Sequence, residues 1–185
     1  TEFINYYIGS TKGLKIYNPF AGAASLIKDN INSDSIYAQE INQETWAIGQ
    51  LRLIVNESSA IYKCEDSIMN WPNNKKFDLI VSNPPFGFYA SKLHKKALEK
   101  NNWISVAKLK KVSNLLLGKS IDSISNNGEI VAVLPSSILY SSGEDERLRK
   151  LMIQRDLIDT IICFPSGILR HTAIPFIVMI LNKSK

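Results

Sequence analysis

The chain has 185 residues, of which 45% are hydrophobic and 21% charged, so it can build one globular core and is not intrinsically disordered. No apolar run reaches membrane-spanning length and no signal peptide is visible, so we expect a cytoplasmic protein without membrane contact. The net charge of +5 is compatible with a polyanionic partner but does not establish one.

Seven apolar runs rich in β-branched residues predict strands. They cover residues 14–17, 36–38, 60–64, 77–81, 129–134, 157–164 and 173–181. Helices are predicted at 2–8, from the first strand's loop to about residue 28, at 43–55, as one long helix over 106–124, and at 143–153. Alternating strands and helices indicate an α/β domain with a mainly parallel sheet. The last connection is too short for a crossover helix, so the last strand is expected to be antiparallel.

Three details of capping and packing follow from the same patterns. Asn42 is expected to cap the helix over 43–55, with Thr45 in its first turn. The apolar residues of that helix are expected to face inward: Trp46, Ile48, Leu51, Leu53, Ile54 and Val55. Cys64 and Cys163 lie in apolar runs, which predicts buried free thiols.

The first strand ends in a loop of mostly small residues. Its members are Asn18, Pro19, Phe20, Ala21 and Gly22. A strand, a tight turn and a helix form an arrangement in which backbone amides meet a ligand at a helix N-terminus. Only one of the three glycines of the dinucleotide fingerprint is present, so an ordinary strand-to-helix turn is at least as good an interpretation.

Acidic residues end the second and third strands. Glu40 lies 22 residues after Asn18, and a carboxylate at such a position can accept both hydroxyls of a ribose. A charge favoured by the following helix N-terminus is the alternative. Asp66 either accepts from an adenine amino group or starts a turn.

The fourth strand ends in a proline motif consisting of Asn83, Pro84, Pro85 and Phe86. A proline pair cannot continue a strand or a helix, so the chain is held extended at the sheet edge where α/β proteins bind ligands. An amide oxygen, a free carbonyl and an aromatic ring can together hold an amino group on a flat base. A structural turn with Phe86 in the core is the alternative.

The ends of these four strands are predicted to meet. Because the carboxyl ends of parallel strands share one edge, we expect Asn18, Glu40, Asp66 and Asn83 to lie together. The following segment is rich in lysine, with Lys92, Lys95, Lys96, Lys100, Lys108, Lys110, Lys111 and Lys119. Lysines beside such an edge can meet phosphates, although a solvated helix face is the better interpretation for most of them.

In combination these motifs resemble the catalytic domain of amino-group DNA methyltransferases, especially the methylation subunit of type I restriction–modification systems. The resemblance spans nearly the whole chain. It is carried by residues 18–23, 38–47, 65–67, 77–87, 128–135 and 172–174.

The resemblance implies a Rossmann-like methyltransferase sheet of seven strands, mostly parallel with the last antiparallel, and helices on both faces. It implies S-adenosylmethionine as methyl donor, with the loop from Asn18 through Pro19, Phe20 and Ala21 to Gly22 at its methionine end. Further implied contacts are Glu40 with the ribose, Ile41 with the donor's adenine, and Asp66 with the adenine amino group. Ser67 is also implied to be a cofactor-binding residue.

The motif formed by Asn83, Pro84, Pro85 and Phe86 is then implied to receive a base flipped out of double-stranded DNA. Adenine, methylated at N6, is the usual target of this motif. Specificity and restriction subunits or regions are the partners that the resemblance implies.

The chain departs from the family pattern at Asn18, where aspartate is usual, and at Ala24 and Ser25, where glycines are frequent. A cofactor-covering helix before the first strand and a DNA-reading region are not recognised. We therefore expect residues 1–185 to be a single catalytic domain from a longer protein. Two alternatives stay open: an amino-group methyltransferase acting on RNA adenine, cytosine N4 or protein glutamine, and a degenerate DNA-docking module.

Overall fold

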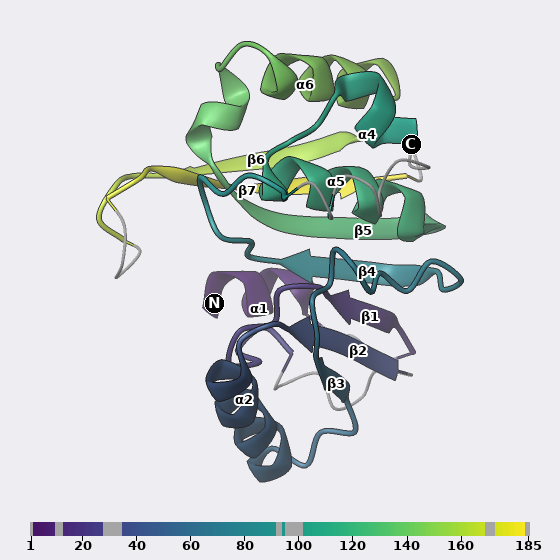
Figure 1. Ribbon diagram of the computed structural model, residues 1–185, viewed down its shortest axis with the longest axis vertical. Helices are drawn as coiled ribbons and strands as arrows, with labels where there is room; N and C mark the ends of the chain where they lie inside the picture. Colours follow the sequence, from purple (N-terminus) through teal and green to yellow (C-terminus); the bar gives the residue numbers. More distant parts are fainter. Residues whose placement is uncertain are drawn as a thin grey trace.

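The computed structural model describes residues 2–9, 13–27, 35–91, 94, 102–168 and 173–183. Their strands form one sheet in the order β3-β2-β1-β4-β5-β7-β6 (Figure 1). The strands are β1 (Lys15–Asn18), β2 (Ser35–Glu40), β3 (Ile61–Cys64), β4 (Phe77–Ser82), β5 (Ile124–Pro135), β6 (Ile158–Phe164) and β7 (Phe176–Asn182).

The predicted sheet is confirmed, including the relative directions of its strands. Strands β1 to β5 pair in parallel, whereas β7 runs antiparallel to both β5 and β6. In the sheet, β1 has β2 on one side and β4 on the other. The strand order therefore changes direction between β1 and β4, which makes this position the topological switch point of the sheet. Open α/β sheets bind ligands at the carboxyl ends of the strands beside such a point.

Helices cover both faces of the sheet. They are α1 (Glu2–Ile8), α2 (Gln43–Val55), α4 (Asn102–Ala107), α5 (Val112–Ser123) and α6 (Glu144–Gln154), with a 3₁₀ turn η1 (Ser136–Leu139). One buried cluster joins α4, α5 and α6 to the sheet, and a second joins α1 and α2 to the other face. Within β4, Ile80 belongs to the first cluster, whereas Leu79 and Val81 belong to the second. Strands buried on both faces read as continuous apolar runs, which explains the sequence pattern.

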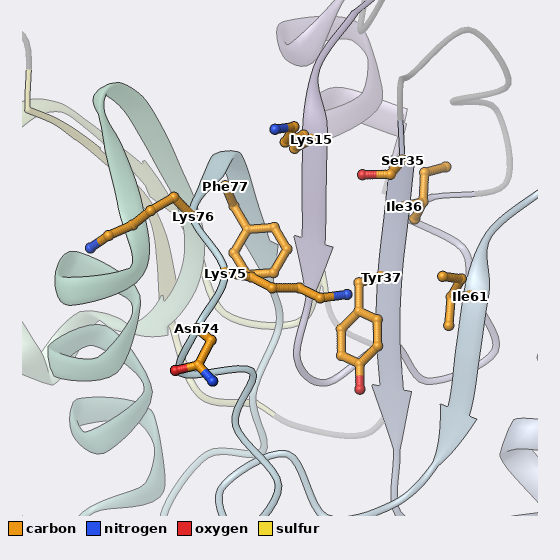
Figure 2. Close-up of a pocket in the computed structure, with 9 residues that line it drawn as sticks. All are labelled: Lys15, Ser35, Ile36, Tyr37, Ile61, Asn74, Lys75, Lys76 and Phe77. Carbon is orange, nitrogen blue, oxygen red and sulfur yellow. The ribbon is translucent and has the colours of Figure 1, made fainter.

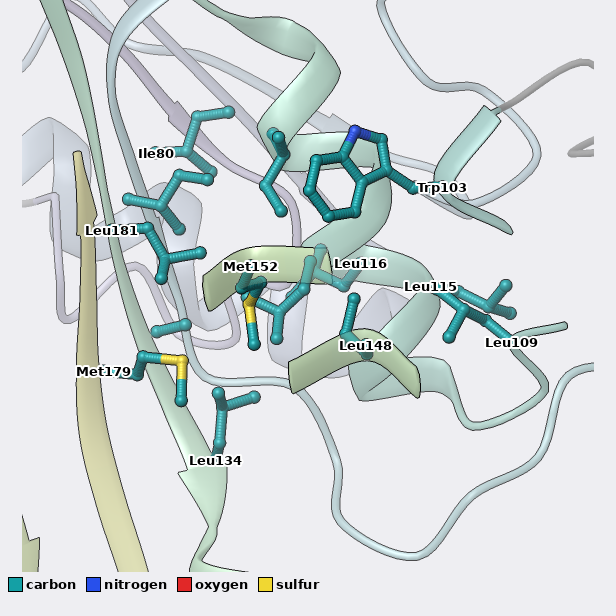
Figure 3. Close-up of a cluster of buried hydrophobic side chains, with 14 of the residues drawn as sticks. Ile80, Trp103, Leu109, Leu115, Leu116, Leu134, Leu148, Met152, Met179 and Leu181 are labelled. Carbon is teal, nitrogen blue, oxygen red and sulfur yellow. The ribbon is translucent and has the colours of Figure 1, made fainter. Parts of the chain in front are cut away.

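Figure 3 shows the first cluster, in which side chains from the helices gather over the central strands. Trp103, Leu116 and Met152 come from α4, α5 and α6 and share this cluster with Ile80 and Met179 of the sheet. All five side chains are buried. This half of the molecule is therefore a packed support for β4. No helix within the described ranges is long and apolar enough to cross a membrane.

The prediction of one helix over 106–124 is wrong. Helix α4 ends at Ala107, and Lys108 then adopts a left-handed conformation with φ of 51°. The chain next pairs with the segment after the proline motif: the Ala90 amide donates to the Lys110 carbonyl at 2.8 Å, and the Val112 amide donates to the Phe88 carbonyl at 2.9 Å. This non-local pairing replaces the helix.

Helix α2 begins as predicted, because the Asn42 side chain accepts from the Thr45 amide at 2.8 Å. Its predicted inward face is wrong for most members. Ile48, Leu51, Ile54 and Val55 are exposed, and only Gly49 and Leu53 of the helix are buried. The helix stands beside β2 and β3 at one end of the sheet (Figure 1), so it has little sheet to cover.

Two smaller predictions are also wrong. Residues 22–27 form turns and not the start of a helix; residue 28 lies outside the described ranges. Cys64 and Cys163 are exposed and not buried. They lie in β3 and β6, the two outermost strands, where no neighbouring strand shields one side.

Candidate active site

The candidate site lies at the carboxyl edge, by which we mean the edge where strands β1 to β5 end. Asn18 ends β1 and Glu40 ends β2, while Asp66 lies two residues after the end of β3 and Asn83 directly follows β4. Because β3, β2, β1 and β4 are consecutive parallel neighbours, the predicted placement at one edge is confirmed.

The loop after β1 is fixed by hydrogen bonds to the neighbouring strands. The Ala21 amide donates to the Gln39 carbonyl at 2.9 Å. The Ser67 hydroxyl donates to the Pro19 carbonyl, and the Tyr62 hydroxyl donates to the Gly22 carbonyl. The Ser67 side chain therefore holds the backbone of the loop. Phe20 packs partly buried against the α4–α6 cluster and Ala21 is buried, so both help to anchor the loop.

Glu40 joins this loop to helix α2. One of its carboxylate oxygens accepts from the Gly22 amide at 3.0 Å and the other accepts from the Asn42 amide at 2.7 Å. Each oxygen keeps a further lone pair for a hydroxyl donor. Ile41, the next residue, is 64% exposed and offers an uncovered apolar surface at the same edge. The amides of Ala21 and Gly22 have protein partners, and residues 22–27, the described residues after the loop, form turns, so the helix N-terminus predicted here is not found among them.

Asp66 forms a turn and contacts a histidine that the sequence analysis did not single out. One carboxylate oxygen accepts from the Ile68 amide at 2.8 Å, and the other lies 2.8 Å from Nε2 of His94. The His94 Nδ1 accepts from the Ser91 amide at 3.2 Å, so the neutral ring carries its proton on Nε2 and donates to Asp66. The two residues are 28 positions apart, and a lone histidine in a lysine-rich segment gives no local signal of this pairing.

A buried polar network beneath the edge was also missed. Tyr17 donates its hydroxyl hydrogen bond to the Gln39 side chain, which in turn donates to Glu65 at 2.8 Å. Tyr37 donates to the same Glu65 carboxylate at 2.9 Å. Burial, supported by the Glu65 hydrogen bond, raises the pKa of Tyr37 to about 12, so its hydroxyl stays protonated as a donor. Gln39, a polar residue inside an apolar strand, was the available signal.

Asn18 is the most unusual residue of the edge. Its side chain is fully buried, yet neither the amide oxygen nor the amide nitrogen has a hydrogen-bond partner among the described residues. The hydroxyl of Ser82, buried at the end of adjacent β4, also lacks a partner in that part of the chain. A buried polar group without a partner costs about 1–3 kcal/mol, so a ligand group that reached these side chains by displacing the β1 loop would relieve that cost.

The proline motif differs from the β1 loop in exposure. Asn83 and Pro85 are exposed, whereas Pro84 is buried. Phe86 is partly buried and packs against the cluster on the α1–α2 face. The Asn83 side chain is therefore accessible from outside, while the buried prolyl ring fixes the backbone that carries it.

A separate cavity of about 340 Å³ lies at the opposite, amino edge, where the strands begin. Figure 2 shows Lys75 extending over the Tyr37 ring, with its Nζ 4.8 Å from the ring centroid. Lys15 and Ser35 line this cavity at the first residues of β1 and β2. None of the predicted site residues lines it, so this cavity is distinct from the candidate active site.

Comparison with known proteins identifies the family. The family model described as "N-6 DNA Methylase" matches residues 1–185. The chain is 25% identical to the type I restriction enzyme HindI methylase subunit of Haemophilus influenzae over 92% of this chain, and 22% identical to the MpnII methylase subunit of Mycoplasma pneumoniae over 92%. It spans 42% and 36% of the length of these relatives.

Solved structures agree on the fold. The methyltransferase subunit of a type I restriction–modification system from Streptococcus thermophilus superposes with a TM-score of 0.85 at 22% identity, covering 98% of this chain and 43% of that one. A Listeria monocytogenes protein described as a class I S-adenosylmethionine-dependent methyltransferase superposes with a TM-score of 0.81 at 16% identity, covering 100% and 59%. The chain therefore belongs to the N-6 DNA methylase family.

Proposed function

We propose that this domain transfers a methyl group from S-adenosylmethionine to N6 of an adenine flipped out of double-stranded DNA. One observation carries the proposal: the exposed Asn83 follows β4, and the neighbouring strand β1 ends in Asn18, whose buried amide lacks a partner among the described residues. Family membership and relatives named as methylase subunits of type I restriction enzymes support the same reaction. Specificity and restriction subunits are accordingly proposed as partners.

The residues at the ends of β1 and β2 fit the methyl donor. The Asn18 amide offers an acceptor and a donor, which suits the ammonium and the carboxylate of a methionine moiety. Glu40 keeps acceptor positions for a ribose diol, and the exposed Ile41 offers an apolar surface for adenine. Asp66 keeps a further acceptor position for an adenine amino group beside its contact with His94. When bound, this donor supplies an electrophilic methyl group on a sulfonium centre.

The proline motif would prepare the target nitrogen. The N6 lone pair of adenine is delocalised into the ring, which makes the nitrogen a weak nucleophile. Two hydrogen bonds from the amino group, to the Asn83 side-chain oxygen and to the Pro84 carbonyl, would favour a pyramidal nitrogen whose lone pair is available. Fixed dipoles of this kind act by positioning and electrostatics, without a covalent intermediate.

The target must leave the duplex to reach these groups. Flipping one base costs a few kcal/mol, and stacking on an aromatic ring recovers roughly 1–3 kcal/mol. Phe86 can supply only part of this contact, because it is partly buried against the α1–α2 face. The exposed aromatic residues that follow it, Phe88 and Tyr89, have more free surface.

Methyl transfer from tritiated S-adenosylmethionine to DNA, RNA and protein tests the proposal. We expect label in DNA, released as N6-methyladenine after digestion to nucleosides. Label in protein glutamine alone would contradict the proposal and support a second candidate, glutamine methylation. This candidate is raised by similarity to a release factor glutamine methyltransferase from Flavobacterium psychrophilum, which is 34% identical over 52% of this chain. Donor binding without transfer to any substrate would indicate the degenerate docking module.

A further inference from the structure

We propose that a basic pocket beside the proline motif binds the phosphodiester backbone of the DNA strand next to the flipped base, and that Tyr89 stacks on a neighbouring base. This inference rests on the proposed function and specifies where its DNA substrate is held. The pocket has a volume of about 310 Å³, at the lower end of the range for ligand-binding pockets. It is lined by Tyr89, Lys108, Lys110, Lys111, Ser142, Glu144 and Arg147.

The topology places this basic pocket at the carboxyl edge. Tyr89 follows Asn83 by six residues and forms an antiparallel bridge with Lys111. Helix α5 ends directly where β5 starts, at the amino edge, so its first residue, Val112, lies toward the carboxyl edge. Helix α6 follows the carboxyl end of β5 through η1, so it too begins at that edge. The pocket and Asn83 therefore share one edge of the sheet.

The charges of the pocket leave an excess of cations. The Glu144 carboxylate accepts from the backbone amides of Lys110 and Lys111, and the buried Asp145 forms an ion pair with the Lys111 ammonium. Arg147 uses Nε to donate to the Ala107 carbonyl at 2.8 Å, which fixes the guanidinium plane. The exposed ammonium groups of Lys108 and Lys110 add to this positive charge. Phosphate groups are the anions that such lysine and arginine side chains contact along DNA.

Exposed aromatic rings accompany these cations. Tyr89 is 66% exposed although it lines the pocket, and its neighbour Phe88 is 63% exposed. The hydrogen bonds between residues 88–90 and residues 110–112 hold the backbone of this segment and leave both rings uncovered. Proteins that hold single strands combine a positively charged groove with aromatic rings on which bases stack. A strand from which one base has been flipped presents the same groups.

The amino-edge cavity supplies a matched control. It has a similar size and also contains lysines, among them Lys15 and Lys75, but it lies at the other end of the strands. Its aromatic residues, Tyr37 and Phe77, are both buried, and Lys75 covers the Tyr37 ring (Figure 2). A non-specific charge effect would depend equally on the lysines of both cavities, whereas a DNA contact beside the proline motif would depend on those of the basic pocket.

The experiment measures fluorescence anisotropy of a labelled mixed-sequence oligonucleotide, as a single strand and as a duplex, between about 50 and 200 mM salt. The wild-type chain is compared with Lys108→Gln/Lys110→Gln and with the control Lys15→Gln/Lys75→Gln. Each double variant removes two exposed positive charges. We expect the first to reduce the slope of log affinity against log salt for the single strand by about 1.4, because each lost phosphate contact is worth about 0.7. The control should leave the slope unchanged.

A second pair of variants tests the stacking contact. Tyr89→Ala should weaken binding of the single strand by at least about fivefold, because base stacking on an aromatic ring contributes roughly 1–3 kcal/mol. Tyr89→Phe keeps the ring and should bind as the wild type does. Equal losses in the two lysine double variants, an unchanged slope in Lys108→Gln/Lys110→Gln, or no binding of either oligonucleotide by the wild-type chain would overturn the inference.

Methyl transfer by the same variants separates this inference from the proposed function. If Lys108→Gln/Lys110→Gln binds DNA as the wild type does while the wild type methylates DNA, the basic pocket is wrong and the function stands. If the pocket variants lose DNA binding but the wild type transfers no methyl group to DNA, the function is wrong and the pocket stands.

Discussion

The loops after β1 and β4 end neighbouring strands, and each contains an asparagine, yet they are built in opposite ways. The β1 loop is closed: Asn18 is fully buried, and the backbone of the loop is bonded to Gln39, Ser67 and Tyr62. The β4 loop is open: Asn83 is exposed and is stiffened by prolines. From this difference we propose a division of labour, in which the β1 loop encloses the methyl donor and the β4 loop receives the target base from outside.

The largest effect is expected at the open loop. Asn83→Ala should reduce methyl transfer to DNA at least about 100-fold, the usual consequence of removing one fixed dipole at a reacting centre. The fold should persist, because the side chain is exposed. The measurement is the initial rate with tritiated donor. Asn74→Ala, an exposed asparagine of the amino-edge cavity, is the control and should retain the wild-type rate. Full activity of Asn83→Ala would discard its assignment.

The next effect concerns the closed loop. Asn18→Ala should weaken donor binding by about tenfold, because a hydrogen bond to a charged ligand group is lost. The thermal midpoint should not fall, since the substitution also removes a buried amide that has no partner among the described residues. Calorimetric titration and thermal denaturation measure the two quantities.

Ser120→Ala is the matched control for this variant. Ser120 is likewise buried without a partner in the described part of the chain, but it lies in α5. Removal of the Ser120 hydroxyl should leave donor binding unchanged. A large loss of stability in Asn18→Ala with unaltered donor binding would show that the Asn18 amide is structural.

A smaller effect is expected where helix α2 supports the closed loop. A Cβ added at Gly49 would lie 2.6 Å from Cε1 of Tyr62, whose hydroxyl donates to the Gly22 carbonyl. Gly49→Ala should therefore destabilise the protein by about 1–3 kcal/mol through overpacking, although alanine is otherwise the better helix former. Urea denaturation measures the change. Ala47→Gly in the same helix, at an exposed position, gives the ordinary cost of a helical glycine. A gain in stability in Gly49→Ala would refute the contact.

The smallest effect is expected on the outer face of α2. Leu51 is 65% exposed, so Leu51→Ala should change the free energy of unfolding by less than about 0.5 kcal/mol. Leu53, in the same helix, is buried, and Leu53→Ala should cost about 2–5 kcal/mol. Equal losses in the two variants would mean that the outer face is covered in solution.

What could be predicted from the sequence depended on whether the deciding contacts are local or distant along the chain. The strands, the antiparallel β7 and the Asn42 cap follow from local patterns, and the structure confirms them. The break between α4 and α5 depends on pairing with residues 88–90, and the Asp66 contact depends on His94. The local pattern of residues 106–124 does not reveal the pairing with residues 88–90. The local pattern around Asp66 likewise does not reveal the contact with His94.

Exposure was harder to predict for a related reason. Apolar spacing shows which side of an element is hydrophobic, but not whether another element covers it. The exposed face of α2 and the exposed Cys64 both lie near the β3 end of the sheet, where coverage ends. The lysines at 92, 95, 96 and 100 lie outside the described residues. Of the other lysines in that stretch, Lys108 and Lys110 are exposed, and Lys111 is paired with Asp145.

The most direct test measures methyl transfer to DNA as a function of S-adenosylmethionine concentration for the wild type, Asn18→Ala and Asn83→Ala. If the closed loop holds the donor and the open loop positions the target nitrogen, Asn18→Ala raises the half-saturating donor concentration and keeps the plateau rate. Asn83→Ala then lowers the plateau and keeps the half-saturating concentration. A shift of half-saturation in Asn83→Ala at an unchanged plateau would contradict this division between the two loops.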